Sequence, residues 1–180
     1  NFKFNLLKLE KNKNKSTSYS DLKCLIEKFK IFLNLGAKEI ALLMDDIPDD
    51  FNDKYKNKNE GKYHALLANT IQNELGKNIL IVPRVYADEL SDKQNIYLRQ
   101  FLNYLHRDLK IFYCGNTIVQ DQIFSRIKFV NDLIHTNKII IWDNFYANDY
   151  CPRRLFIGPW TNRKKIKNIL INGTGMLHTD

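Results

Sequence analysis

The sequence lacks the features that mark several large classes of protein. Its 180 residues include three cysteines, Cys24, Cys114 and Cys151, with no C-x-x-C pair and no histidine near them at ligand spacing. An odd, scattered set of this kind argues against a disulfide framework and against a zinc site. No apolar run approaches the roughly 20 residues that a membrane-spanning helix needs, and neither a G-x-G-x-x-G nor a Walker motif is present. We therefore expect no membrane association, no metal and no organic cofactor.

The beginning of the chain lacks a starting methionine and a signal peptide. Its first residue is Asn1, and the residues that follow mix lysine and asparagine with apolar side chains. We expect this chain to be a fragment whose native N-terminus is missing. The sequence leaves its compartment, targeting and oligomeric state open.

Arginine is also scarce, although the net charge is +8. The excess of lysine and asparagine lies largely in loops such as 11–15 and 53–59. One interpretation is a solvated surface, and the other is a basic α/β domain that binds nucleic acid with a steep dependence on salt. Because no basic motif is interleaved with aromatic residues, we favour the solvated surface and expect no nucleic-acid partner.

What the sequence does contain is a regular alternation of apolar runs and amphipathic stretches. Strands are predicted at 2–7, 40–44, 79–82, 110–113, 139–142 and 169–171. Helices are predicted from a cap at Ser18 or Ser20 to Gly36, at 63–75 before Gly76, at 96–109 and at 123–133. A strand followed by a helix, repeated in this way, is typical of parallel strands joined by right-handed crossovers.

Both a doubly wound sheet and a (β/α)8 TIM-type barrel fit this alternation. A complete barrel has eight strands and about 250 residues, and this chain offers about six strands. The barrel would therefore be incomplete: residues 1–180 would form one partial domain with about strands 3 to 8, without the first two strands and the last helix.

Two adjacent carboxylates, Asp45 and Asp46, follow the apolar run that ends at Met44. Side chains alternate along a strand, so Asp45 shares a face with Ala41 and Leu43. In a barrel that face points inward, and Asp45 would lie at the mouth where such folds bind ligands. The plainer alternative is that both acids begin a solvated loop.

A later strand would add two more side chains to the same mouth. Trp142 and Asn144 share one face of the strand at 139–142, whereas Asp143 points away and would make a hydrogen bond in the outer layer. For Trp142 alone, packing in the core is the simpler alternative. Two carboxylates in one apolar mouth cannot both ionise freely, so one can carry a proton near neutral pH while the other stays charged. That division suits the acid and base steps of a glycosidase.

Two stretches of the chain closely resemble signatures of one enzyme family. They are ALLMDDI at 41–47, and IIWDNFYANDY at 140–150 with RLFIGP at 154–159. Both are similar to segments of the protein O-GlcNAcases and bacterial hyaluronidase-type β-N-acetylglucosaminidases, glycoside hydrolase family 84. The pair Tyr97-Leu98 and the segment Tyr113-Cys114-Gly115 fall at the expected places between them.

This resemblance implies a (β/α)8 barrel and a retaining exo-β-N-acetylglucosaminidase, a carbohydrate-processing hydrolase. In that family the 2-acetamido oxygen of the substrate attacks the anomeric carbon and forms an oxazoline, so no enzyme nucleophile is needed. By resemblance, Asp45 orients the acetamido N–H and stabilises its developing positive charge. Asp46 protonates the leaving oxygen and later deprotonates the incoming water.

The resemblance also implies roles for five further residues. Tyr86 matches a tyrosine that hydrogen-bonds the acetamido group, and Trp142 matches the aromatic wall around the acetyl methyl. Asn144 matches an amide near the reacting centre. Asp149 matches the acid that holds the O4 and O6 hydroxyls, and Asn172 matches a second hydroxyl-binding amide.

Three departures from the family pattern stand out. Arg84-Val85 replaces the usual polar and acidic pair before Tyr86, and Gly173-Thr174-Gly175 replaces a proline-containing run after Asn172. The family's first two strands, which supply a backbone contact and a lysine, have no counterpart here. We therefore expect the chain on its own to aggregate or to be inactive. The alternative function is a non-catalytic, GlcNAc-binding remnant of such a barrel. Whether the natural substrate is a glycoprotein, a hyaluronan fragment or a cell-wall fragment stays open.

Overall fold

The computed structural model describes residues 15–45, 59–148 and 158–174, with side chains described from residue 21 onward. These residues fall into two compact units, which are treated separately below. The first unit comprises Asn1–Arg84 and Ile96–Leu109, and the second comprises Val85–Asn95 and Lys110–Asp180. The predicted strand at 2–7 lies outside the described residues. In the described part of the chain, no helix is both long and apolar enough to cross a membrane.

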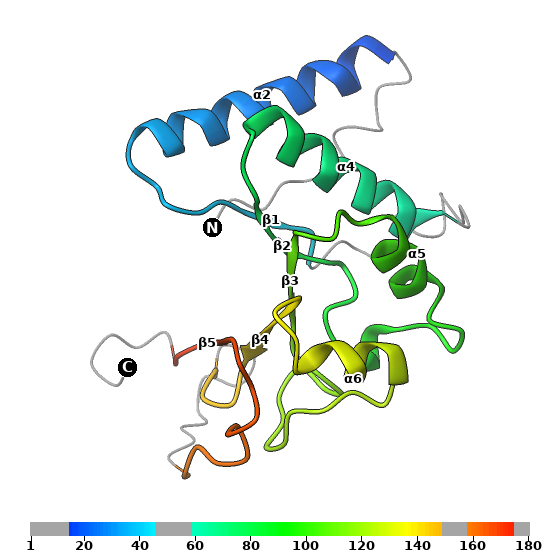
Figure 1. Cartoon of the computed structure of the whole chain (residues 1–180), viewed down its shortest axis with the longest axis vertical. Coiled ribbons are helices and arrows are strands. Elements are labelled where there is room, and N and C mark those ends of the chain that lie inside the picture. Colours follow the sequence, from blue (N-terminus) through cyan, green and yellow to red (C-terminus); the bar gives the residue numbers. More distant parts are fainter. Residues whose placement is uncertain (1–14, 46–58, 149–157, 175–180) are drawn as a thin grey trace. The chain divides into compact units, whose positions relative to one another are not determined.

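The first unit is a β-α-β element with additional helices (Figure 1). Strands β1 (Ala41–Leu43) and β2 (Leu80–Val82) pair in parallel, with Leu42 opposite Ile81, and helix α4 (Glu60–Leu75) connects them. Helices α2 (Lys15–Asn34) and α5 (Ile96–Tyr104) both pack against α4. The approach of α5 is close enough to require glycine at position 61, because a methyl group there would overlap the Tyr97 carbonyl oxygen.

The second unit is a three-stranded parallel sheet. Its strands are β3 (Lys110–Tyr113), β4 (Ile139–Asp143) and β5 (Ile169–Ile171), and β4 pairs with both of the others. Helix α6 (Lys128–Ile134) connects β3 to β4, and a 3₁₀-helix, η1 (Asp88–Leu90), lies in the segment that begins at Val85. The parallel α/β prediction is confirmed within each unit.

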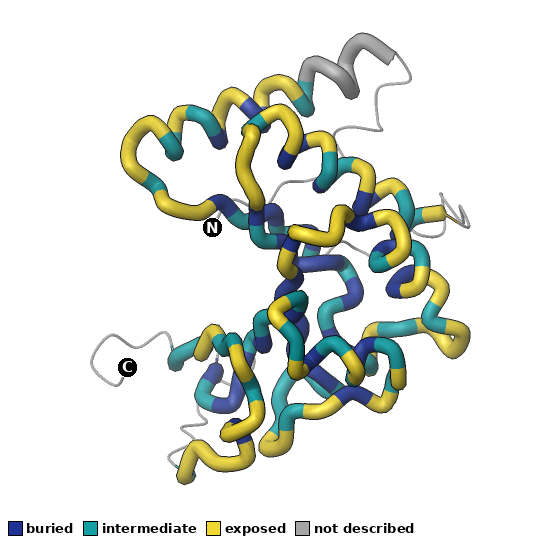
Figure 2. Tube along the Cα trace, in the orientation of Figure 1, coloured by how far each residue is buried: buried dark blue, intermediate teal, exposed yellow. Residues whose placement is uncertain are grey.

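Burial alternates along the strands as the sequence predicts. On β1 and the residues beside it, Ile40, Leu42 and Met44 are buried, whereas Ala41, Leu43 and Asp45 are partly exposed. Figure 2 shows the same distinction between buried and exposed positions along the helices and strands of each unit. The side of β1 that carries Asp45 is therefore the less buried side, although the Oδ1 atom of the Asp45 carboxylate is itself buried.

The predicted bounds of the described strands agree with the structure to within one residue, but four helix ends were predicted wrongly. Helix α4 begins at Glu60, three residues before the predicted start at 63. Helix α2 begins at Lys15, so neither Ser18 nor Ser20 is its cap. Helix α5 ends at Tyr104 instead of 109. There the Asn69 side-chain amide of α4 donates to the Tyr104 carbonyl and accepts from the His106 backbone N–H. These two bonds take the place of a further helical turn.

The fourth predicted helix was expected to start at 123, but α6 starts at Lys128. The reason is a carboxylate from another segment. The Ser125 hydroxyl and the Arg126 N–H both donate to Asp88, at 2.7 and 2.6 Å. These bonds hold the chain before α6 in an irregular path, because the side chain of Asp88 takes the place of helical carbonyl acceptors.

Candidate functional site

The first candidate, Asp45, lies two residues after the end of β1 in the first unit. The Met44 N–H donates to the Val82 carbonyl at 2.9 Å, so the parallel pairing continues up to the residue before the acid. Asp45 is the turn residue at which that ladder ends, and its side chain is partly exposed. Asp46 lies outside the described residues, and so does Asp149. The geometry of the predicted pair is therefore still a prediction.

The second unit brings two of the predicted aromatic residues together. The rings of Tyr86 and Trp142 lie with centroids 5.8 Å apart and planes inclined by 38°. Phe112 approaches Trp142 edge-on from the neighbouring strand, at 6.3 Å. Trp142 is only partly buried. The ring is therefore held by two aromatic neighbours while part of the residue stays accessible, which suits the wall of a binding site.

Two predicted amides lie next to each other where β4 and β5 end. The Asn172 NH2 group donates to the Asn144 carbonyl oxygen at 3.0 Å, and the Asn172 backbone N–H donates to the Asp143 carbonyl at 2.8 Å. Asn144 follows β4 directly and Asn172 follows β5 directly. Because these strands are parallel neighbours, residues that follow their carboxyl ends share one edge of the sheet.

Cys114 links these residues to one another, a role that sequence reasoning missed. Its backbone N–H donates to the Tyr86 carbonyl at 2.7 Å, and its sulfur accepts from the Asn144 NH2 group at 3.3 Å. The thiol is buried, and burial, with a smaller contribution from Asp143, raises its pKa to about 12 against the opposing effect of the Asn144 bond. The sulfur is therefore a neutral acceptor and not a nucleophile at ordinary pH.

The turn after Cys114 requires a glycine. Gly115 has φ 122°, in the region that L side chains rarely adopt, and a methyl group there would lie 2.9 Å from the Phe124 carbonyl oxygen. The turn carries the chain back so that the Gln120 amide reaches the Cys114 carbonyl at 2.6 Å. It also places the Ile118 carbonyl 3.0 Å from the Asn144 NH2 group.

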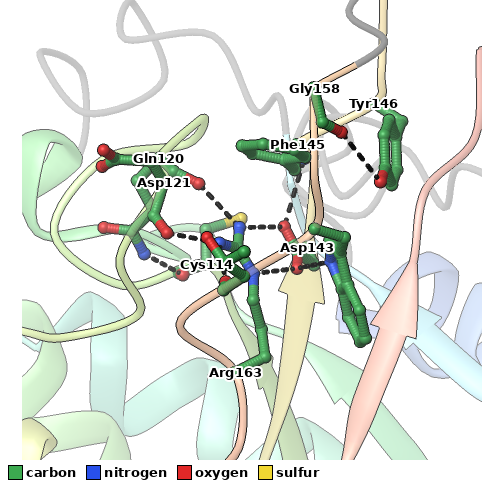
Figure 3. A network of polar contacts seen from close by, with 10 residues as sticks. Cys114, Gln120, Asp121, Asp143, Phe145, Tyr146, Gly158 and Arg163 are labelled. Carbon is green, nitrogen blue, oxygen red and sulfur yellow. Dashed lines mark hydrogen bonds and ion pairs between the residues drawn. The ribbon is translucent and has the colours of Figure 1, made fainter.

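A buried ion pair lies on the opposite face of β4 from Trp142. Asp143 is 1% exposed and accepts from Arg163 Nε at 2.9 Å, from the Trp160 indole N–H at 2.9 Å and from the Phe145 N–H at 3.1 Å. This confirms the prediction that Asp143 makes outer-layer hydrogen bonds. Figure 3 shows the Arg163 guanidinium beside this carboxylate. The same guanidinium donates to the carbonyls of Gln120, Asp121 and Thr161, so it joins three segments.

Sequence reasoning missed Arg163 as well, because its partners are distant in the chain and nothing in its local pattern marks it. It also missed the acceptor role of Asp88, whose carboxylate additionally accepts from the Tyr113 hydroxyl at 2.7 Å. Burial and this bond raise the pKa of Tyr113, so the hydroxyl stays protonated.

A third network in the first unit explains the departure at Arg84. Its guanidinium donates to both oxygens of Glu60, at 2.5 and 2.8 Å, and lies over the Tyr97 ring at 4.9 Å. The Arg84 backbone N–H donates to the Tyr97 hydroxyl, which lies 2.9 Å from His64 Nδ1. A hydroxyl can accept two hydrogen bonds, so the tautomer of the His64 ring decides whether Nδ1 donates to the Tyr97 hydroxyl or accepts from it. Burial, followed by Arg84, lowers the pKa of His64 to about 3.

Among the described residues, no group of three or more histidine, cysteine, aspartate or glutamate side chains could hold a metal ion. Arg153 and Arg154 lie outside the described residues. The described residues of the second unit thus form an aromatic wall beside two amides. These groups can bind a polar ligand that has an apolar side.

Comparison with known proteins identifies what this arrangement is similar to. A family model described as beta-N-acetylglucosaminidase matches residues 10–174. The protein O-GlcNAcase of Rattus norvegicus is 31% identical over 150 residues, which cover 76% of this chain and 16% of the rat protein. This chain therefore spans only about a sixth of that curated relative.

Two solved structures are similar in fold. CpGH84B matches with a TM-score of 0.71 and 21% identity, over 89% of this chain and 30% of that chain. A mutant O-GlcNAc hydrolase of Thermobaculum terrenum matches with a TM-score of 0.72 and 22% identity, over 90% of this chain and 37% of that chain. Both are catalytic domains with TIM-barrel folds. That the barrel is incomplete in this chain stays a prediction.

Proposed function

The chain belongs to the β-N-acetylglucosaminidases of glycoside hydrolase family 84, and from that premise we propose that its parent protein is a retaining exo-β-N-acetylglucosaminidase. It hydrolyses terminal β-linked GlcNAc, either O-GlcNAc on proteins or GlcNAc of glycans. The observation that carries the proposal is the grouping of Tyr86, Trp142, Asn144 and Asn172 at one edge of the second unit. An aromatic face beside two amides suits a sugar that carries an acetyl methyl and several hydroxyls.

The proposed chemistry uses the substrate's own acetamido group. Its carbonyl oxygen attacks the anomeric carbon while the bond to the leaving oxygen breaks, and Asp46 gives that oxygen a proton. Asp45 accepts a hydrogen bond from the acetamido N–H as positive charge develops there, which stabilises the transition state. Water then attacks the same carbon, Asp46 takes its proton, and the oxazoline reopens to the acetamide. Two inversions give net retention.

The proposal divides the roles between the two acids by their positions. Asp45 lies at the end of the parallel ladder with one carboxylate oxygen buried, which suits an anion held in a fixed position. The proton carrier, Asp46, follows it in the chain. Asp149 holds the O4 and O6 hydroxyls in this proposal, while Asn172 holds a further hydroxyl. Tyr86 and Trp142 enclose the acetamido group.

The test is fluorophore release from an aryl β-N-acetylglucosaminide by the full-length protein, with Asp45→Asn and Asp46→Asn alongside. Loss of general acid catalysis costs about 10²- to 10⁴-fold. The Asp46 variant should lose less with an activated leaving group, which hardly needs protonation, whereas the Asp45 variant should lose as much with either substrate. Equal losses for both leaving groups in the Asp46 variant would contradict its role as the acid. A folded, inactive wild-type protein would favour the GlcNAc-binding remnant.

A further inference from the structure

The orientation of the Asn144 amide follows from its partners. The Ile118 backbone carbonyl can only accept hydrogen bonds, so the Asn144 atom 3.0 Å from it is the NH2 group. The same group donates to Cys114 Sγ at 3.3 Å, which uses its second hydrogen. The Asn144 carbonyl oxygen therefore faces Asn172, and the Asn172 NH2 group donates to it at 3.0 Å. One backbone carbonyl and one thiol thus determine the orientation of two amides.

These hydrogen bonds determine which of the two amides can bind a ligand. Asn144 is 7% exposed, and both of its N–H bonds are used inside the protein. Asn172 is only partly buried. Because its NH2 group faces Asn144, its carbonyl oxygen faces the other way. Asn172 is therefore oriented as an acceptor, and a sugar hydroxyl is the kind of donor that it fits.

The backbone of Cys114, next to the thiol that accepts from Asn144, is itself held in place by hydrogen bonds. Gln120 donates to the Cys114 carbonyl, and Arg163 donates to the Gln120 carbonyl at 2.8 Å (Figure 3). The Cys114 N–H binds the Tyr86 carbonyl at 2.7 Å. Cys114 is thus the junction between the tyrosine and the amides: its backbone holds Tyr86 and its thiol holds Asn144.

We propose that Cys114 is a positioning residue of the glycosidase site, whose thiol orients Asn144 and, through it, the carbonyl oxygen of Asn172 toward a sugar hydroxyl. This inference rests on the proposed function. A hydroxyl of the substrate is present in the ground state and in the transition state alike. Loss of the orientation should therefore weaken binding uniformly, which raises KM and leaves kcat nearly unchanged.

The test compares Cys114→Val with Cys114→Thr in the full-length protein. The two side chains have the same shape, but only threonine offers an acceptor to the Asn144 NH2 group. With the aryl β-N-acetylglucosaminide we expect KM about tenfold higher for valine than for threonine, the effect of one buried donor left without its partner. Cys114→Ala and Cys114→Ser form a second pair with the same contrast, in case the branched side chains do not fit.

A control separates this effect from a general loss of packing. Thr136→Val makes the same exchange of hydroxyl for methyl at the end of α6, where the hydroxyl donates to the Leu133 carbonyl at 2.7 Å. It should leave KM unchanged. A merely structural role for Cys114 would reduce the folded fraction and so lower apparent kcat, with KM unaffected.

A second readout does not depend on turnover. In protein labelled with ¹⁵N-asparagine, the Asn144 side-chain NH2 signal, assigned by its loss in Asn144→Asp, should exchange slowly with solvent in the threonine variant and faster in the valine variant. Equal KM values and equal exchange in the two variants would overturn the inference. A wild-type protein without turnover would instead overturn the proposed function. Amide exchange alone would then show whether the residue at position 114 holds the Asn144 NH2 group.

Discussion

Replacing Arg163 by methionine should destabilise the protein strongly. The side chains of Arg163 and Asp143 are 3% and 1% exposed, with Nε and Oδ2 2.9 Å apart. Methionine is apolar and of similar length, so Arg163→Met removes the charge without opening a large cavity. It leaves the Asp143 carboxylate in the interior with two donors, the Phe145 N–H and the Trp160 indole. It also removes the donor to the Gln120 carbonyl.

The size of the effect follows from which group is left behind. Removing one partner of a buried ion pair costs about 3–5 kcal/mol, because the other charge stays in a medium of low polarity. Each backbone carbonyl that loses its donor adds about 1 kcal/mol. The expected loss is therefore at least about 3 kcal/mol, a large part of the roughly 5–15 kcal/mol that stabilises a typical protein.

The assay is urea unfolding of the full-length protein, with Arg107→Met as a matched control. Arg107 is 92% exposed and lies 3.9 Å from Asp108, an arrangement that contributes about 0–1 kcal/mol. A difference of less than about 1 kcal/mol between the two variants would refute the reasoning. The double variant Arg163→Met with Asp143→Asn should lose less free energy of unfolding than the sum of the two single variants. The reason is that no buried carboxylate is then left without its cationic partner.

Three further predictions follow from the described residues. The pKa of His64 is about 3 in the folded state, against an ordinary value of 6.5. Between these two pH values the unfolded chain therefore binds a proton that the folded chain does not. The free energy of unfolding should fall by about 1.4 kcal/mol per pH unit below 6.5, and His64→Gln should flatten this slope; an unchanged slope would contradict the assignment. Iodoacetamide at pH 8 should modify the exposed Cys24 and spare the buried Cys114, as read by peptide mass spectrometry, and equal labelling would contradict it. Gly61→Ala should lower the melting temperature by several degrees, because its methyl would overlap the backbone of α5; an unchanged melting temperature would show that α4 and α5 are farther apart.

The strands could be predicted because their signal is local. Each apolar run is bounded by polar or glycine residues, and alternation along β4 correctly separated Asp143 from Trp142. The same alternation grouped Asp45 with Ala41 and Leu43, which lie together on the less buried side of β1 in the structure. These properties depend on neighbours within a few positions, which the sequence displays directly.

The helix ends and the supporting contacts could not be predicted, because they depend on partners far along the chain. Asp88 delays the start of α6 from 37 positions away, and Asn69 ends α5 from 35 positions away. Arg163 reaches Asp143 across 20 positions, and Cys114 reaches Asn144 across 30. In each case a side chain forms a hydrogen bond with a group far along the sequence, and only the folded chain brings the two together.

The most direct test of the proposed activity is a comparison of two substrates that differ only at the 2-position. The full-length protein is given an aryl β-N-acetylglucosaminide and the matching aryl β-glucoside, which lacks the acetamido group. If the substrate supplies its own nucleophile, kcat/KM for the glucoside should be lower by orders of magnitude, because no group remains to attack the anomeric carbon. Comparable hydrolysis of both substrates would contradict substrate-assisted catalysis and would require an enzyme nucleophile instead.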